Sequence, residues 1–173
     1  NAENLWMKPG SFWTQPAGES HITSAKGEEN LALVEIDNGP YLVQSTTEAF
    51  DIGERPFNVD VYIIVWLNSD PSTWINEGTG VELSMLIQQN RKDEFKSLFL
   101  KLPSGCEGEI ITNGEIVHAV LIQGELNFLL PKEQKNKTLD PGSYYSSMGH
   151  SIHQVKNTSN IESLIYVRMN GDL

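Results

Sequence analysis

Short apolar and β-branched segments alternate with turn-forming residues along most of the chain. The turns contain Gly, Pro, Asn and Asp, as in Asn113-Gly114 and Asp140-Pro141-Gly142, and these residues favour tight reversals of the backbone. Many short segments with regular turns are typical of a β-sandwich or β-barrel. Strands are predicted at residues 31–36, 41–43, 59–67, 81–87, 95–102, 109–112, 117–122, 126–130, 143–146, 152–155 and 164–169.

One stretch, residues 84–92, has apolar residues at a spacing that would suit a helix, but the match is weak. The sequence therefore predicts an all-β protein. Residues 132–137 are charged and polar, so we expect a solvated loop there.

A polar stretch at residues 44–54, followed by Arg55-Pro56, divides the chain. Polar connections of this kind commonly join separately folded parts. We therefore predict a leading segment at residues 1–46, a linker at 47–56 and a complete barrel at 57–173.

Composition excludes several classes of protein. The chain has 173 residues, a length that suits one globular core. Its formal net charge of −11 repels nucleic acid and anionic membranes. No apolar run approaches the roughly 20 residues that span a bilayer. Cys106 is the only cysteine, which excludes an internal disulfide and a cysteine-cluster metal site. We expect a soluble protein, and leave open a cytoplasmic or a periplasmic location.

The two ends of the chain are similar at a fixed offset of 132 residues, without a gap. The repeat predicts that both regions form the same strand–turn–strand–strand unit. The matching positions are Pro9-Gly10-Ser11 with Pro141-Gly142-Ser143, Phe12-Trp13 with Tyr144-Tyr145, His21 with His153, Leu33-Val34 with Ile165-Tyr166, and Asn38-Gly39 with Asn170-Gly171.

The spacing within each copy resembles the second motif of the cupin superfamily: Gly, five residues, Pro-x-Gly, two residues, His, three residues and Asn. The first copy has Gly10, Pro16, Gly18 and His21, with Ala25 in place of Asn. The second copy has Gly142, His153 and Asn157, with Met148 and His150 in place of Pro and Gly, and Gly105 and Gly124 match the glycines of the first cupin motif.

The resemblance implies a cupin barrel, an RmlC-like jelly roll or double-stranded β-helix, with extra strands at its N-terminus. It covers residues 95–173 well and residues 8–40 in part. The chain is thus similar to a bicupin whose first unit is partial, and to ChrR-like cupins. We also expect a homodimer, for which exchange of β-strands is one route.

In metal-binding cupins, two histidines and a glutamate of the first motif and the histidine of the second hold one ion. The matching positions here are Ile111, Asn113, Val117 and His153. Ile and Val cannot coordinate a metal, and an amide oxygen binds transition metals poorly. The resemblance therefore predicts a degenerate site without a metal cofactor. One alternative remains: His118, turned inward by a bulge, could join His153 and His150 around one divalent transition metal.

The leading hypothesis for function is a binding module without a firm catalytic assignment. Its pocket would accept a small polar organic ligand between Asn113, His118, Tyr145 and His153. A metal-dependent cupin enzyme of the dioxygenase or isomerase type, with a rearranged site at His118 and His153, is one alternative. A sensor or interaction domain of a transcriptional regulator is another. The sequence leaves open whether the protein is an enzyme, because one fold hosts many functions.

Overall fold

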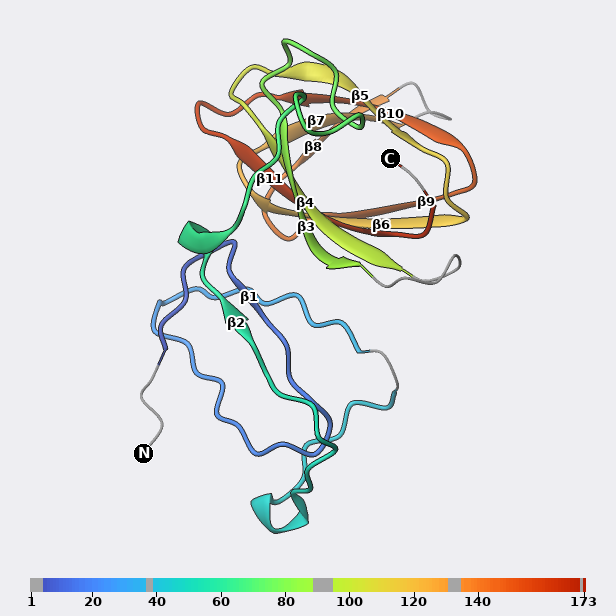
Figure 1. Cartoon of the computed structure of the whole chain (residues 1–173). Helices are drawn as coiled ribbons and strands as arrows, with labels where there is room; N and C mark the ends of the chain where they lie inside the picture. Colours follow the sequence, from blue (N-terminus) through green and yellow to red (C-terminus); the bar gives the residue numbers. More distant parts are fainter. Residues whose placement is uncertain (1–4, 37–38, 89–94, 131–134, 172) are drawn as a thin grey trace.

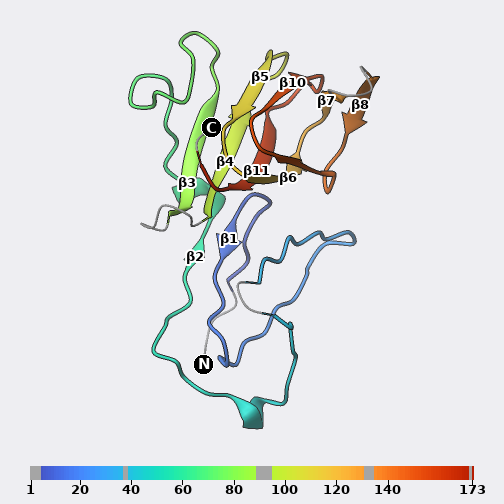
Figure 2. The same ribbon diagram turned by 90° about the vertical axis from the view of Figure 1, so that its right-hand side faces the viewer.

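The computed structural model describes residues 5–36, 39–88, 95–130, 135–171 and 173. Two antiparallel sheets face each other and form a barrel (Figures 1 and 2). The five-stranded sheet holds, in spatial order, β3 (Glu82–Gln88), β4 (Lys96–Leu102), β11 (Ser163–Met169), β6 (Ile116–Gln123) and β9 (Tyr144–Met148). The four-stranded sheet holds β5 (Glu107–Thr112), β10 (Ser151–Asn157), β7 (Leu126–Leu130) and β8 (Lys135–Leu139).

The core lies between the two sheets, because alternate side chains of each strand point inward. In β6, Val117, Ala119 and Leu121 are buried, whereas His118 and Val120 between them are partly exposed. The prediction of an all-β protein with a cupin β-barrel is confirmed. Strands predicted from residue 81 onward correspond to observed strands, with bounds that differ by a few residues.

Asn157 of β10 holds together the loops at one end of the barrel. Its side chain is 1% exposed and its Nδ2 donates to the carbonyl oxygens of Leu102, Pro103 and Ile161. Its Oδ1 accepts hydrogen bonds from the backbone N–H and the hydroxyl of Ser159. The cupin-motif asparagine thus satisfies backbone groups that burial would otherwise leave without partners.

Two stretches of the chain, residues 132–137 and 84–92, differ from their sequence pattern or fall partly outside the described residues, as residues 132–134 do. Residues 135–139, expected in part to be a loop, form β8 at the edge of the four-stranded sheet. Exposed lysines suit an edge strand because charge discourages pairing with another chain. The stretch 84–92, whose helical spacing is weak, belongs to β3 as far as Gln88, in keeping with the all-β prediction, and residues 89–92 lie outside the described residues.

The N-terminal segment, defined here as residues 5–65, lies outside the barrel (Figure 1). Its regular elements among the described residues are the short strands β1 (Phe12–Trp13) and β2 (Asn58–Val59), which pair with each other, and the 3-10 turns η1 (Thr46–Glu48) and η2 (Val61–Ile63).

The predicted strands at residues 31–36 and 41–43 are therefore wrong, and most of 59–67 is also irregular. These segments have the right composition, but a strand forms only where a neighbouring strand accepts its backbone hydrogen bonds. The division of the chain at residues 46 and 57 stays a prediction, although β1 and β2 come from opposite sides of it.

Candidate functional site

His153 lies inside the barrel, on the inward face of β10. It is 4% exposed and sits directly across from Ile110 in the ladder between β10 and β5. Its ring stacks on Phe128 of β7 at a centroid distance of 5.1 Å, and the Tyr145 ring of β9 lies 5.4 Å away. Phe128 and Tyr145 are themselves 4.5 Å apart. Three strands thus bring one imidazole and two aromatic rings together in the core.

A chain of hydroxyl groups extends from this imidazole. His153 Nε2 is 2.9 Å from Ser147 Oγ, Ser151 Oγ donates to Ser147 Oγ at 3.0 Å, and Thr112 Oγ1 is 2.8 Å from Ser151 Oγ. Because Ser147 accepts from Ser151, its own hydrogen is available to donate to Nε2. In the tautomer in which Ser147 donates to Nε2, the ring proton of a neutral His153 lies on Nδ1.

His153 Nδ1 is buried and has no hydrogen-bond partner among the described residues. A buried polar nitrogen without a partner costs about 1–3 kcal/mol, and such atoms are rare in folded proteins. The unpaired Nδ1 beside two aromatic rings makes His153 the candidate functional residue of the barrel interior.

The interior is electrically neutral. Burial lowers the pKa of His153 below its usual value and raises the pKa of Tyr145 well above its usual value, because a low-dielectric interior disfavours the charged form of each group. Among the buried residues that the structure describes, the polar ones are Ser, Thr, Asn and His, with no acidic residue, lysine or arginine. The site therefore offers hydrogen bonds and aromatic surface but no counter-ion.

The other two predicted ligand-binding residues are elsewhere. His118 lies on the outer face of the five-stranded sheet, where its Nδ1 is hydrogen-bonded to the Tyr144 hydroxyl and its ring stacks on that of Tyr144. Asn113 is exposed, and its Oδ1 is 2.6 Å from Nδ1 of the exposed His150. The structure thus brings Tyr145 and His153 together but places Asn113 and His118 outside their site.

The residues present do not fit a metal centre of the cupin type. Ile111 is 41% exposed and pairs with the equally outward Ile152, so the inward positions of β5 are Ile110 and Thr112. The inward groups around His153 are therefore apolar or hydroxyl-bearing and bind transition metals poorly. His118, His150 and His153 do not converge, and the described part of the chain holds no group of three or more His, Cys, Asp or Glu suited to a metal. The absence of a metal cofactor remains a prediction.

The family described as a domain of unknown function, DUF4437, matches residues 1–173. The chain belongs to the DUF4437 family. No match was found among curated proteins.

Solved structures similar to this DUF4437 protein include cupins, and the likeness shows a fold of the cupin type. An RmlC-like cupin from Ralstonia eutropha JMP134 is 14% identical, with a TM-score of 0.51 over 65% of this chain and 66% of that chain. The cupin domain of Cnp3 from Schizosaccharomyces pombe is 10% identical, with a TM-score of 0.50 over 68% and 79%. One chain of the solved Rhodobacter sphaeroides complex of SigE with the anti-sigma ChrR is 14% identical, with a TM-score of 0.44 over 57% of this chain and 48% of that chain. At these identities the likeness to the Ralstonia and Schizosaccharomyces structures shows the fold alone.

Sequence reasoning missed Phe128, Ser147, Ser151 and Thr112 of the DUF4437 site. Their neighbourhood follows from pairing between strands that are distant in the sequence. The one available signal was alternation: Tyr145 and Ser147 share a face of β9, and Ser151 and His153 share a face of β10.

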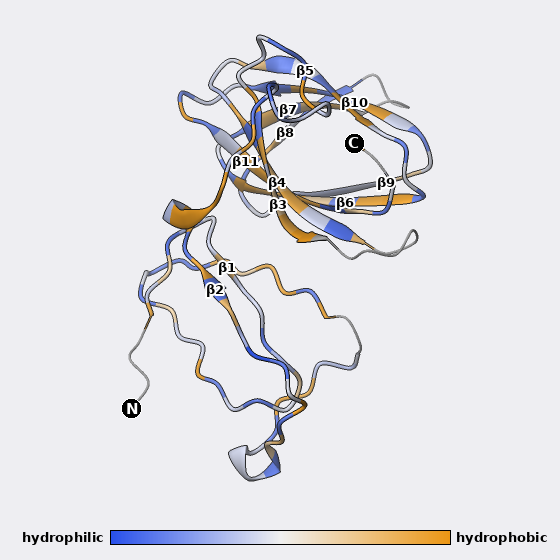
Figure 3. Ribbon diagram, in the orientation of Figure 1, coloured by the Kyte–Doolittle hydropathy of each residue, from blue (hydrophilic) through white to orange (hydrophobic). Residues whose placement is uncertain are grey.

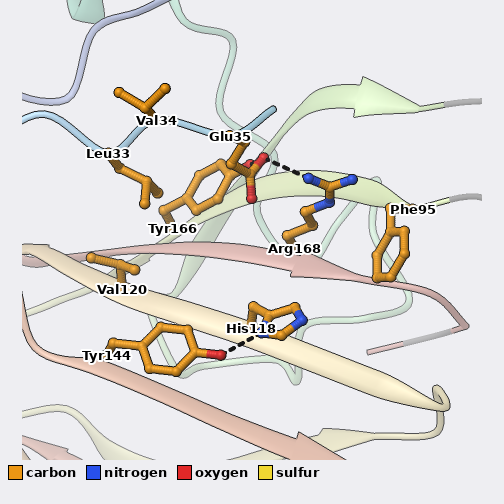
Figure 4. Close-up of a pocket in the computed structure, with 9 residues that line it drawn as sticks. All are labelled: Leu33, Val34, Glu35, Phe95, His118, Val120, Tyr144, Tyr166 and Arg168. Carbon is orange, nitrogen blue, oxygen red and sulfur yellow. Dashed lines mark hydrogen bonds and ion pairs between the residues drawn. The ribbon is translucent and has the colours of Figure 1, made fainter. Parts of the chain in front are cut away.

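A cavity of the DUF4437 protein lies on the outer face of the five-stranded sheet, beneath the N-terminal segment (Figure 4). It has a volume of about 420 Å³. Glu35 crosses it and accepts a hydrogen bond from the Tyr166 hydroxyl, and its carboxylate lies 3.4 Å from the Arg168 guanidinium. Because Glu35 and Arg168 are paired with each other, neither charged group of this cavity is left without a partner to bind a ligand.

Of the described helices, none is long and apolar enough to cross a membrane.

Proposed function

We propose that this DUF4437 protein binds an uncharged small organic molecule inside its barrel, beside His153. The observation that carries the proposal is the buried Nδ1 of His153, which lacks a partner while Nε2 is engaged by Ser147. A ligand oxygen would accept the Nδ1 proton and remove the cost of leaving it unpaired.

The surroundings of His153 favour a neutral ligand with an apolar body. Phe128 and Tyr145 supply aromatic surface against which a ring or aliphatic group packs. An ionised ligand would lose its hydration without gaining a counter-ion, and that desolvation costs several kcal/mol or more. The expected class is therefore a carbonyl, ether or hydroxyl compound.

Saturation-transfer NMR on the full chain tests this proposal with cyclohexanone and phenol as neutral probes and benzoate as the charged counterpart. We expect the neutral probes to bind and benzoate to bind less. His153→Phe keeps the aromatic ring but removes Nδ1, so it should weaken binding of cyclohexanone about tenfold or more.

His118→Phe is the matched control, because His118 lies on the outer face of the sheet. It should leave binding unchanged. Equal affinity of wild type and His153→Phe, preference for benzoate, or no binding of either neutral probe would contradict the proposal.

The two alternative functions receive less support. A metal-dependent enzyme built on His118 and His153 would need both imidazoles on one side of the barrel wall, and they lie on opposite sides of it. A sensor domain of a transcriptional regulator would be compatible with the same ligand site, but no feature of the described residues favours it over binding alone.

A further inference from the structure

The N-terminal segment is rich in apolar side chains but adds nothing to the core of the described chain. The buried hydrophobic residues of the barrel begin at Ile75. Of the 23 large hydrophobic side chains that are exposed among the described residues, 17 lie between Leu5 and Val65. Figure 3 shows hydrophobic residues scattered along the N-terminal segment, most plainly at η2.

The surface area of the chain is larger than a self-sufficient monomer would have. A compact monomer of 19.3 kDa exposes about 8,500 Å². This chain exposes 12104 Å², about 3,600 Å² more than that expectation. Stable dimers bury roughly 800–2,500 Å² on each partner, so the excess is sufficient for an extensive interface.

The internal repeat explains why the segment has not buried its apolar side chains. Gly10 and Gly142 both have positive φ, at 85° and 91°. The Ser11 N–H donates to the Lys8 carbonyl at 3.0 Å, and the Ser143 N–H donates to the Asp140 carbonyl at 2.9 Å. The two copies thus start with the same turn, and β1 and β9 follow these turns.

The copies differ in what surrounds them. In the second copy, β11 lies between β4 and β6 and is paired on both edges. Residues 31–36, the matching part of the first copy, are not in a strand. A repeat unit of this kind cannot bury its hydrophobic face alone, so the N-terminal segment needs a partner surface.

We propose that the partner is a second copy of this chain, and that the two N-terminal segments pack against each other across a two-fold axis. The contact would centre on Tyr41, Leu42 and Val43, which are 62%, 67% and 84% exposed. Residues 39–47 contain no acidic or basic side chain. This matters because a two-fold contact places identical residues near each other, and a charged stretch in a chain of net charge −11 would repel its own copy.

Analytical ultracentrifugation of the full chain from 1 to 100 µM tests the proposal. The expected species has twice the mass of 19.3 kDa. Val43→Glu should raise the dissociation constant by at least about tenfold, since it places two carboxylates beside the two-fold axis. Val43 is too exposed for this change to unfold the barrel, and the thermal midpoint of the monomer checks that point.

Ile161→Glu is the matched control, because Ile161 is an exposed hydrophobic residue of the barrel, outside the N-terminal segment. It should leave the dissociation constant unchanged. Hydrogen exchange provides a second readout: amides of residues 41–43 should exchange more slowly as the protein concentration rises. The proposal is overturned if the protein is a monomer at 100 µM, even if it associates with another polypeptide. It is also overturned if the protein is a dimer that Val43→Glu does not weaken. These results are independent of ligand binding in the barrel.

Discussion

At the scale of single residues, burial decides what His153 can do. An imidazole on the surface exchanges its proton with solvent near neutral pH, whereas the buried ring of His153 is held neutral. Neutrality makes it a directional hydrogen-bonding group, with Nε2 committed to Ser147 and Nδ1 left for another partner. The partly exposed His118 instead hydrogen-bonds to Tyr144, and the exposed His150 to Asn113.

The lowered pKa of His153 predicts how stability depends on pH. The unfolded chain takes up a proton on this residue near the usual histidine pKa of 6.5, whereas the folded chain resists protonation until a lower pH. Between these two values the unfolded state binds more protons, so the free energy of unfolding falls as the pH decreases. Above the unfolded pKa, His153 contributes no pH dependence.

Urea unfolding at pH 5, 6, 7 and 8 measures this effect. The loss of stability of the wild type below about pH 6.5 should exceed that of His153→Phe, by at most about 1.4 kcal/mol per pH unit. Identical pH profiles for the two proteins would show that the folded state does not disfavour protonation of His153.

At the scale of elements, glycines allow the strands to pack closely at turns. Gly124 links β6 to β7 with φ at 84°, and a Cβ there would lie 2.4 Å from Ser163 Oγ and 2.8 Å from Ser163 Cα. Gly105, before β5, also has a positive φ of 73°, but a Cβ there would meet nothing within 4 Å. Comparing Gly105 with Gly124 therefore separates the energetic cost of backbone strain from that of a steric clash.

Alanine substitutions at these glycines should therefore differ in cost. Gly105→Ala carries only the strain of positive φ, about 1 kcal/mol. Gly124→Ala adds a clash with the backbone of β11, so its free energy of unfolding should fall by about 1–3 kcal/mol more. Denaturant unfolding measures both values. Equal costs would mean that the loop at Gly124 shifts without strain.

At the scale of the whole molecule, different interactions stabilise the barrel and the N-terminal segment. The barrel has a continuous core from Ile75 to Met169. The N-terminal segment is attached to it through contacts such as those of Glu35 with Tyr166 and Arg168. Because the core includes no residue of the segment, the stability of the barrel should not depend on it.

Deleting residues 1–56 should accordingly leave a cooperatively folding barrel. Calorimetry of the truncated protein should show one transition with a midpoint within about 5 °C of that of the full chain. The truncated protein should also be monomeric, since the proposed dimer contact is gone. Loss of the cooperative transition would show that the barrel requires the N-terminal segment.

The sequence by itself determined where the strands of the barrel lie, except β8, and which type of fold they form. The alternation in residues such as Val117, Ala119 and Leu121, the turn glycines and the spacing around His153 are local features, and local features suffice to predict strands and turns.

Only the tertiary structure decided which side chains share the interior. A shift of one residue moves a side chain to the other face of a strand, so Ile110 rather than Ile111 faces His153, and His118 faces outward. The structure also decided that residues 31–36 are not a strand, despite their composition. Strand formation depends on hydrogen bonds to a neighbour that is distant in the sequence, and local sequence does not reveal whether that neighbour is present.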